Sequence, residues 1–310
     1  MRIDDRVVVA LRELTDLAPL HQPKSLAALD AVARALPGVP AVACFDTAFH
    51  ATLPAAAATY ALPSAWRKRW DLRRYGFHGL SHAYASRRAT AITGAARVIT
   101  VTSQPARRSP PCATADRSTP PWGFTPLDGL VMATRPGSID PGLLLWLLEH
   151  GEMSEPEMAK ALEHDAGLAG LAGTHDMREI LARAELGDDE ARLALDVYLH
   201  RLRAGIAAMA AALSGVEAIA FTGGVGERAP AVRAGALAGL EFLRLRIDGA
   251  QNESAHGDTE ITGPGSATRV LVVAAREDLE IARQVRQVMD PRSGSKRSPR
   301  DNDQPGTPGV

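Results

Sequence analysis

The sequence predicts an α/β fold, because short apolar runs typical of buried strands alternate with longer segments of helical periodicity. Apolar side chains recur every three or four positions in residues 188–213, which indicates an amphipathic or buried helix. A glycine-rich turn at residues 221–227 follows one of the strands and leads into another helix. With 310 residues, the chain is long enough for two domains.

In the first part of the chain, two strands are predicted. Residues 39–45 (VPAVACF) follow Pro-Gly punctuation and end at Asp46. Residues 63–74 are basic and aromatic, and the following sequence, RYGFHGLSH, carries two glycines and is typical of a loop. Residues 96–101 (ARVITV) are the second predicted strand.

Residues 101–122 (VTSQPARRSPPCATADRSTPPW) interrupt this alternation. They contain five prolines and no apolar period, which taken alone is typical of a disordered linker. The regular pattern resumes beyond this segment, first with a short apolar helix at residues 141–150.

The last part of the chain repeats the alternation of strand and helix. Strands are predicted at residues 216–222 (VEAIAFT) and 269–275 (RVLVVAA), and a helix at about 278–289. Residues 291–310 are rich in Pro, Ser, Gly and charge, so we expect a disordered tail there.

The composition is that of an ordinary globular protein and excludes several classes of function. A formal net charge of −1 gives no support for nucleic-acid binding, and no apolar run is long enough to predict a membrane span. The first residues lack the features of a secretory signal. Cys44 and Cys112 alone are too few for a disulfide framework or a thiolate metal site. We therefore expect a cytoplasmic protein without a nucleic-acid or membrane partner.

Four features could carry chemistry, and each has an ordinary structural alternative. The glycines in 221–227 would let backbone amides approach a phosphate, although glycine turns also serve packing. Asp46, after a predicted strand, could hold a metal or orient a nucleophile, or could cap a turn. His78 and His82 could face an anion or could be solvated surface histidines. Arg135 lies in a predicted loop and could bind an oxyanion or support the loop.

Together, seven ordered segments make the sequence similar to the acetate kinases. The resemblance runs from about residue 14 to 289, except for residues 101–122. The segments are LAPLHQP (17–23), CFDTAFHATLP (44–54), RRYGFHGLSH (73–82), GFTPLDGLVMATRPGSIDPG (123–142), DMRE (176–179), FTGGVGE (221–227) and AREDLEIAR (275–283).

The resemblance implies the acetate and sugar kinase/Hsc70/actin (ribonuclease H-like) fold, an α/β fold with two related domains, the first of them incomplete in this sequence. Residues 1–45 and 276–290 would be the remnant of the N-terminal domain. Residues 46–275 would be the second kinase domain, with 101–122 aberrant. The family normally works as a homodimer, so a homodimer is expected.

The activity implied by the resemblance is reversible phosphoryl transfer from ATP to acetate with Mg²⁺, giving acetyl phosphate and ADP. Asp46 matches the family's active-site aspartate. His78 and Arg135 match the residues that stabilise the transferring phosphoryl group, and His21 matches a residue near the acetate and phosphate site.

The resemblance also assigns the nucleotide and metal contacts. Glu277 matches the carboxylate that holds Mg²⁺. Arg228 and Arg276 each replace a usual Asn, and Pro136 replaces a usual Ser beside Arg135. The positions that match nucleotide-binding residues are Asp176, Met177, Arg178, Gly224, Val225, Gly226, Glu227 and Arg228.

Two parts of the family pattern have no counterpart in this sequence. The opening strand and turn with its phosphate and metal contacts, and the following segment with a substrate-site arginine, are not found before LAPLHQP. In residues 101–122, relatives carry a His-Leu-Gly-x-Gly phosphate loop and a hairpin that ends in Asp-Thr-Thr-Met, whereas Thr102 stands at the histidine position here.

We interpret residues 101–122 as an out-of-frame translation, with a genuine Pro-rich insertion as the alternative. Synonymous codons for this interval permit a shifted reading close to His-Leu-Ala-Thr-Gly-Ala-Ser-Leu-Ala-Ala-Val-Arg-Asp-Gly-Arg-Ser-Ile-Asp-Thr-Thr-Met. The sequence therefore predicts an acetate kinase that is inactive or impaired as this polypeptide. The alternatives are a non-catalytic remnant that binds nucleotide, and a kinase for propionate or butyrate.

Overall fold

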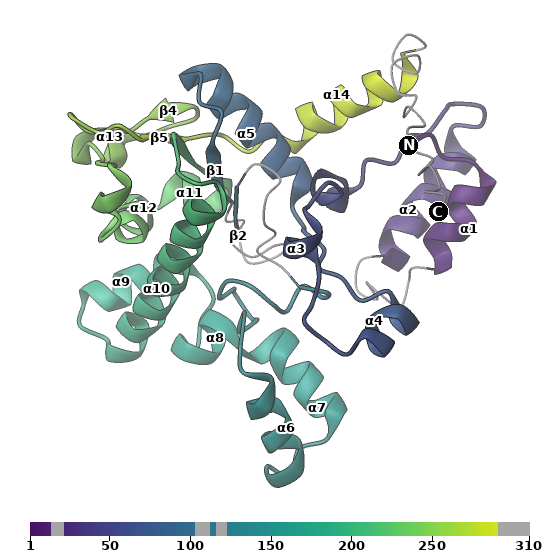
Figure 1. The fold of residues 1–310 in the computed structure, drawn as a ribbon, viewed down its shortest axis with the longest axis horizontal. Helices are drawn as coiled ribbons and strands as arrows, with labels where there is room; N and C mark the ends of the chain where they lie inside the picture. The colour runs from purple at the N-terminus through teal and green to yellow at the C-terminus, as the bar shows by residue number, and fades with distance from the viewer. Residues whose placement is uncertain (14–21, 103–111, 116–122, 291–310) are drawn as a thin grey trace, which may run out of the picture. The chain divides into compact units, whose positions relative to one another are not determined.

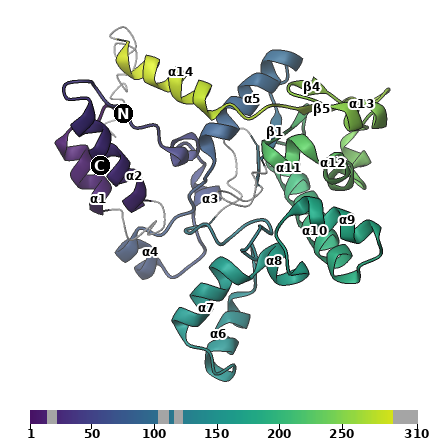
Figure 2. The same ribbon diagram turned by 180° about the vertical axis from the view of Figure 1, so that it is seen from behind.

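A computed structural model describes residues 1–13, 22–102, 112–115 and 123–290. The chain divides into two compact units (Figures 1 and 2), one formed by Met1–Cys44 with Ile281–Val310 and the other by Phe45–Glu280. The predicted tail at 291–310 and most of the segment 101–122 lie outside the described residues. The assignment of the first unit as a domain remnant stays a prediction.

The first unit contains helices α1 (Asp5–Glu13) and α2 (Gln22–Ala35). An ion pair between Arg12 and Asp30 joins the two helices at 3.0 Å. The strand predicted at residues 39–45 is wrong, since only an isolated bridge between Arg2 and Val42 forms there. No residue of this segment is buried, so the apolar run lacks the neighbouring strands and the burial that a central strand requires.

A five-stranded mixed sheet, in the order β2-β1-β3-β5-β4, organises the second unit. β1 pairs in parallel with β3, and β3 with β5, while the two edge strands β2 and β4 run antiparallel to their neighbours. The strands are β1 (Val98–Thr102), β2 (Cys112–Ala115), β3 (Ala218–Thr222), β4 (Thr259–Glu260) and β5 (Arg269–Val272). The three predicted strands after residue 95 are thus confirmed, and four residues of the segment 101–122 form an edge strand rather than a linker.

Three helices that the sequence predicts with residue ranges are present. α6, α10 and α14 coincide with the predicted segments to within one residue. The helices of the second unit are α3 (Ala55–Ala58), α4 (Ser64–Trp70), α5 (Gly79–Thr93), α6 (Pro141–His150), α7 (Glu155–Lys160), α8 (Gly167–Ala172), α9 (Met177–Glu185), α10 (Asp189–Ala212), α11 (Gly223–Arg228), α12 (Pro230–Leu237), α13 (Gly249–Ser254) and α14 (Glu277–Met289, of which the first four residues belong to this unit), with short helical turns η2 (Asp46–His50), η3 (Ala161–Asp165) and η4 (Glu241–Leu243).

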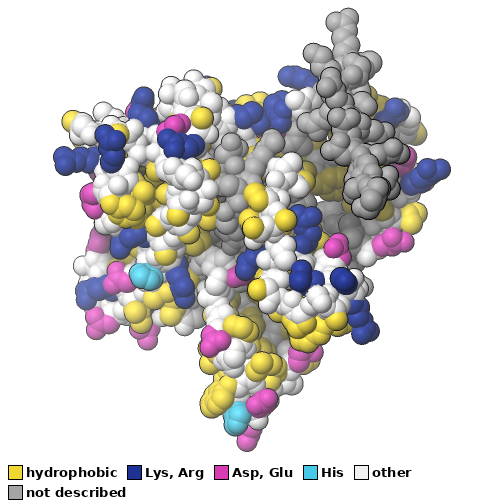
Figure 3. All heavy atoms as spheres, viewed as in Figure 1, with side chains coloured by type: hydrophobic (Ala, Val, Ile, Leu, Met, Phe, Trp, Pro, Cys, Tyr) yellow, Lys and Arg dark blue, Asp and Glu magenta, His cyan; other side chains and the backbone are white. Residues whose placement is uncertain are grey.

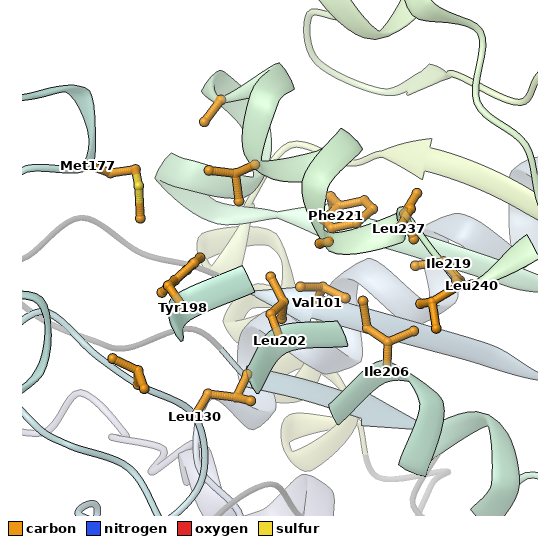
Figure 4. Close-up of a cluster of buried hydrophobic side chains, with 14 of the residues drawn as sticks. Val101, Leu130, Met177, Tyr198, Leu202, Ile206, Ile219, Phe221, Leu237 and Leu240 are labelled. Carbon is orange, nitrogen blue, oxygen red and sulfur yellow. The ribbon is translucent and has the colours of Figure 1, made fainter. Parts of the chain in front are cut away.

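Both faces of the central strands are covered, which explains why they are continuous apolar runs rather than alternating ones. On one face, Ile99, Val101 and Phe221 pack with Tyr198, Leu202 and Ile206 of α10 (Figure 4). On the other face, Ala85 and Ala89 of α5 pack against Val98, Ala218 and Ala220. The small alanines let α5 lie close to the sheet, and in its first turn Oγ of Ser81 lies 3.4 Å from Oγ1 of Thr102, the last residue of β1.

Candidate active site

Asp46 binds the N-terminus of α5 through its side chain. Its Oδ2 accepts a hydrogen bond from the backbone N–H of His78 at 2.7 Å, and its Oδ1 accepts one from Leu80 at 3.1 Å. The first amides of a helix have no partner within the helix, and a carboxylate placed there also interacts favourably with the helix dipole. The Asp46 carboxylate is therefore held in a fixed orientation by a helix more than thirty residues away in the chain.

The His78 ring lies beside this carboxylate. Its Nδ1 is 4.0 Å from Oδ2 of Asp46, and its backbone is left-handed, with φ of 56°. Only 9% of the residue is exposed, and this burial lowers the pKa of His78, an effect that Asp46 partly opposes. The ring is consequently neutral near pH 7 and can donate only one N–H.

Two glycines of RYGFHG are required by close packing around this pair. A Cβ on Gly79 would lie 2.0 Å from the carbonyl oxygen of Asp46, and one on Gly76 would lie 2.1 Å from Cγ of His50. Glycine at these two positions therefore lets η2 approach the turn that precedes α5.

Two further histidines, His50 and His82, are buried near Asp46 and His78. Nδ1 of His82 lies 2.7 Å from Oγ1 of Thr100, and Nε2 of His50 lies 3.0 Å from the carbonyl oxygen of Phe77. Burial lowers the pKa of both rings, and that of His82 falls well below its usual range. The interpretation of His78 and His82 as surface histidines is thus wrong. His50 was not predicted from the sequence, because its contacts connect segments that only the fold brings together.

Arg135 lies in a loop, as predicted, and the loop is fixed by backbone contacts. The N–H of Met132 donates to the carbonyl of Arg135 at 3.0 Å, and the N–H of Leu168, in the first turn of α8, donates to the carbonyl of Met132 at 2.9 Å. The guanidinium makes one long hydrogen bond of 3.4 Å, to the carbonyl of Pro126, and its partial burial lowers its pKa.

The structure brings Asp46 and His78 into contact, and links Arg135 to them indirectly. Met132 is buried against Phe77, the residue before His78, so the arginine loop and the histidine turn pack on each other. A common cleft for all three side chains stays a prediction. His21, predicted near the substrate, lies outside the described residues.

Asp176 and Arg178 form a compact pair at the start of α9. Asp176 is the N-cap of the helix and accepts a hydrogen bond from the backbone N–H of Arg178 at 3.0 Å. The side chain of Arg178 pairs with the same carboxylate and is the main cause that lowers the pKa of Asp176 to about 2. Met177 instead points into the hydrophobic core (Figure 4), so only its backbone is available to a ligand.

Within the predicted glycine turn at 221–227, Phe221 and Thr222 end β3, and the residues from Gly223 onward form a short helix, α11, rather than an open loop. Gly226 is buried and Arg228 is exposed. The Oε1 atom of Glu227 accepts hydrogen bonds from the N–H of Gly223 at 2.9 Å and from the N–H of Ala275 at 3.0 Å.

The predicted metal ligand, Glu277, begins α14 and is half-buried. Among the described residues, no group of three His, Cys, Asp or Glu side chains could enclose a metal ion. Mg²⁺ is commonly bound by one or two carboxylates together with substrate phosphates and water, so a single carboxylate at this position fits that ion.

Comparison with known proteins places this chain and its fold among the kinases. The sequence model of the acetokinase family matches residues 1–283. An acetate kinase from Gloeobacter violaceus is 42% identical over 289 residues, which covers 91% of this chain and 71% of the relative. The crystal structure of Porphyromonas gingivalis acetate kinase superposes with a TM-score of 0.87 at 34% identity, covering 94% of this chain and 74% of that one.

A third similar protein is a propionate kinase from Francisella tularensis, with a TM-score of 0.84 at 34% identity, covering 92% of this chain and 74% of that one. The fold thus defines a kinase of the acetate and sugar kinase/Hsc70/actin fold, which confirms the fold predicted from the resemblance. The chain belongs to the acetokinase family. Within its described part, the structure contains no helix with the length and hydropathy needed to cross a bilayer.

Proposed function

We propose that this chain carries the site for phosphoryl transfer between ATP and acetate, the reaction of the acetate kinases that it resembles. The observation that supports this best is the pair of Asp46 and His78, fixed at the N-terminus of α5 with 4.0 Å between Oδ2 and Nδ1. A migrating phosphoryl group needs hydrogen-bond donors that are already oriented, because charge spreads over its three equatorial oxygens in the transition state.

In this proposal, each side chain has a separate task. The neutral ring of His78 donates one hydrogen bond to the phosphoryl group, Arg135 supplies the positive charge, and Asp46 keeps the turn before α5 in place. Mg²⁺ neutralises charge on the phosphates when it is bound, and Glu277 would hold it. The adenosine side of ATP lies at α11 and near Asp176 at the start of α9. The resemblance assigns His21 to the acetate side, and this residue lies outside the described part of the chain.

We also propose that turnover by this polypeptide is impaired. Thr102 cannot supply the ring donor that relatives have at its position, and Pro136 restricts the backbone of Arg135. A lost charge-assisted hydrogen bond costs about 1.5–3 kcal/mol, and each 1.36 kcal/mol is roughly tenfold in rate. Turnover about ten- to a hundredfold below that of a relative with the intact phosphate loop is therefore expected from this one loss.

The test compares this chain with a repaired variant, in which residues 102–122 are replaced by the shifted-frame sequence given above. Acetyl phosphate formed from ATP and acetate is measured as its hydroxamate, and ADP binding is measured by calorimetry. We expect binding by both proteins and a large gain in turnover on repair. Near-normal turnover by the original chain would contradict the impairment, and absence of ADP binding by both proteins would contradict the kinase site.

Two alternatives are separated by the same measurements. Binding of ADP without any turnover, before or after repair, would favour a non-catalytic nucleotide-binding remnant. The similarity to a propionate kinase makes a longer acceptor the second alternative. Replacing acetate by propionate and butyrate at equal concentrations gives the acceptor preference directly as a ratio of kcat/KM values.

The proposal includes a homodimer and a cytoplasmic location, where ATP is available. Support for the dimer comes from α6, a helix of which no residue is buried although most of its side chains are apolar. Leu145 and Trp146 are 62% and 55% exposed, and Leu143 is 48% exposed. Figure 3 shows hydrophobic side chains gathered on the lower projection that carries this helix. Exposed apolar patches of this kind mark association surfaces.

A further inference from the structure

One carboxylate oxygen connects two strand ends of the central sheet. Oε1 of Glu227 accepts from Gly223, the first residue after β3, and from Ala275, three residues after β5. β3 and β5 are parallel neighbours, and the pairing continues past β5 with the N–H of Val273 donating to the carbonyl of Phe221 at 2.8 Å. Glu227 therefore extends the connection between the strands beyond the last ladder hydrogen bond.

Under the proposed function, one of the two segments that Glu227 joins binds the nucleotide and the other binds the metal ion. Gly223 begins the turn that would face the adenosine, and Ala275 lies two residues before Glu277, which would hold Mg²⁺. A backbone shift in either segment changes the distance between nucleotide and metal ion. Both amides point at the same oxygen atom, so the two segments can move apart only if one of these hydrogen bonds is lost.

A buried arginine holds the same turn from the other side. Arg233 is 1% exposed, and its Nη1 donates to the carbonyls of Gly226 at 2.9 Å and of Glu227 at 3.0 Å. Its Nε and Nη2 donate to the side chain and the carbonyl of Asn252. The guanidinium thus satisfies carbonyls of α11 that its short length leaves without helical partners.

We propose that Glu227 is a positioning residue for the nucleotide and metal sites, acting through its hydrogen bonds to Gly223 and Ala275 and supported by Arg233. Oε1 of its carboxylate faces two backbone amides, and in this proposal Glu227 affects the nucleotide and Mg²⁺ through these amides rather than through the direct nucleotide contact that the family resemblance implies. This inference rests on the proposed function for its effect on ligands, but the backbone connection itself can be measured without any ligand.

The test separates the two properties of the Glu227 carboxylate, its hydrogen-bond acceptor oxygen and its negative charge. Glu227→Gln keeps Oε1 as an acceptor but removes the charge, whereas Glu227→Asp keeps the charge on a side chain that is too short, and Glu227→Ala removes both. Glu190→Ala, at an exposed position of α10, is the matched control. ADP affinity is measured by calorimetry with and without Mg²⁺, and thermal melting checks that each variant is folded.

We expect Glu227→Ala and Glu227→Asp to weaken ADP binding in the presence of Mg²⁺ by roughly tenfold, because losing the two hydrogen bonds lets the two backbone segments move apart. Glu227→Gln should weaken ADP binding in the presence of Mg²⁺ by less than about threefold, and the control Glu190→Ala should bind ADP as the original chain does. A loss of Mg²⁺-dependent affinity by Glu227→Gln as large as that of Glu227→Ala would mean that the charge itself contacts the ligand, and would overturn the proposal. Unchanged affinity in Glu227→Ala and Glu227→Asp would overturn it as well.

Hydrogen exchange separates failure of this inference from failure of the proposed function. In the protein without ligand, Glu227→Ala or Glu227→Asp should speed amide exchange in residues 222–228 and 273–277 together, while Glu227→Gln should not. If the original chain binds no ADP, the proposed function fails, and the exchange result alone decides the connection. Unaltered exchange in both segments would show that Glu227 does not join them.

Discussion

Asp46 and His78 are connected twice by the same oxygen atom. Oδ2 of Asp46 accepts from the backbone N–H of His78 at 2.7 Å and lies 4.0 Å from Nδ1 of its ring. The hydrogen bond to the backbone N–H caps the N-terminus of α5, and the second contact places a carboxylate beside the imidazole ring of His78. A change at Asp46 therefore affects stability and the environment of His78 together.

The first prediction is that Asp46→Asn destabilises the second unit. An amide offers one acceptor where the carboxylate offers two, so its NH₂ group would face the N–H of His78 or of Leu80. A buried donor left without a partner costs about 1–3 kcal/mol, and we expect a loss in that range in urea unfolding. Asp196→Asn, at an exposed position of α10, is the control. Equal unfolding free energies for the two variants would contradict the role given to Asp46.

The second prediction concerns the close approach at Gly79. Its Cβ would lie 2.0 Å from the carbonyl oxygen of Asp46, so Gly79→Ala must push η2 away from α5. Overpacking of this kind costs about 1–3 kcal/mol. At Gly249, no atom lies within 4 Å of the added Cβ, and Gly249→Ala should be neutral or slightly stabilising. Thermal melting compares the two variants. A Gly79→Ala variant with the same melting temperature as the original chain would show that η2 is free to move.

The regular elements could be predicted from local pattern, because a strand such as β3 is apolar at its first four positions and a helix such as α10 shows its period over 24 residues. The strand predicted at 39–45 is wrong because local pattern is not sufficient there. An apolar run becomes a strand only when other strands pair with it. In the site, Asp46 and His78 were found through motifs. Arg233 and His50 were missed because their roles depend on backbone carbonyls of other segments, and no sequence pattern marks an acceptor carbonyl.

The third prediction is a loss of stability at mildly acid pH. Burial lowers the pKa of His82 well below its usual range, and lowers those of His50 and His78 as well. The unfolded chain then binds protons near pH 6.5 that the folded chain does not bind. Stability is therefore fully present above pH 6.5 and falls as the pH decreases below it, by up to about 1.4 kcal/mol per pH unit for each histidine.

Urea unfolding at several pH values between 4.5 and 7.5 checks this dependence. His82→Gln removes one buried ring that takes up a proton only when the chain unfolds, and the glutamine can still bond to Thr100. The slope of the unfolding free energy against pH below pH 6.5 should therefore decrease. His200→Gln, on the exposed side of α10, should leave the slope unchanged. A stability that rises on acidification from pH 6.5 would be inconsistent with neutral buried histidines.

The last prediction is that α6 carries the contact between two copies of the chain. Burying apolar surface contributes about 25 cal/mol per Å², and a charge placed within such a contact costs several times what one methylene group contributes. Leu145→Glu should therefore convert the dimer to a monomer in light scattering at micromolar concentration, with unchanged thermal melting of the monomer's secondary structure. Leu186→Glu is the matched control, because Leu186 is 88% exposed but lies after α9, away from α6 in the sequence. A dimer that survives Leu145→Glu, or an original chain that is monomeric at the same concentration, would exclude α6 as the interface.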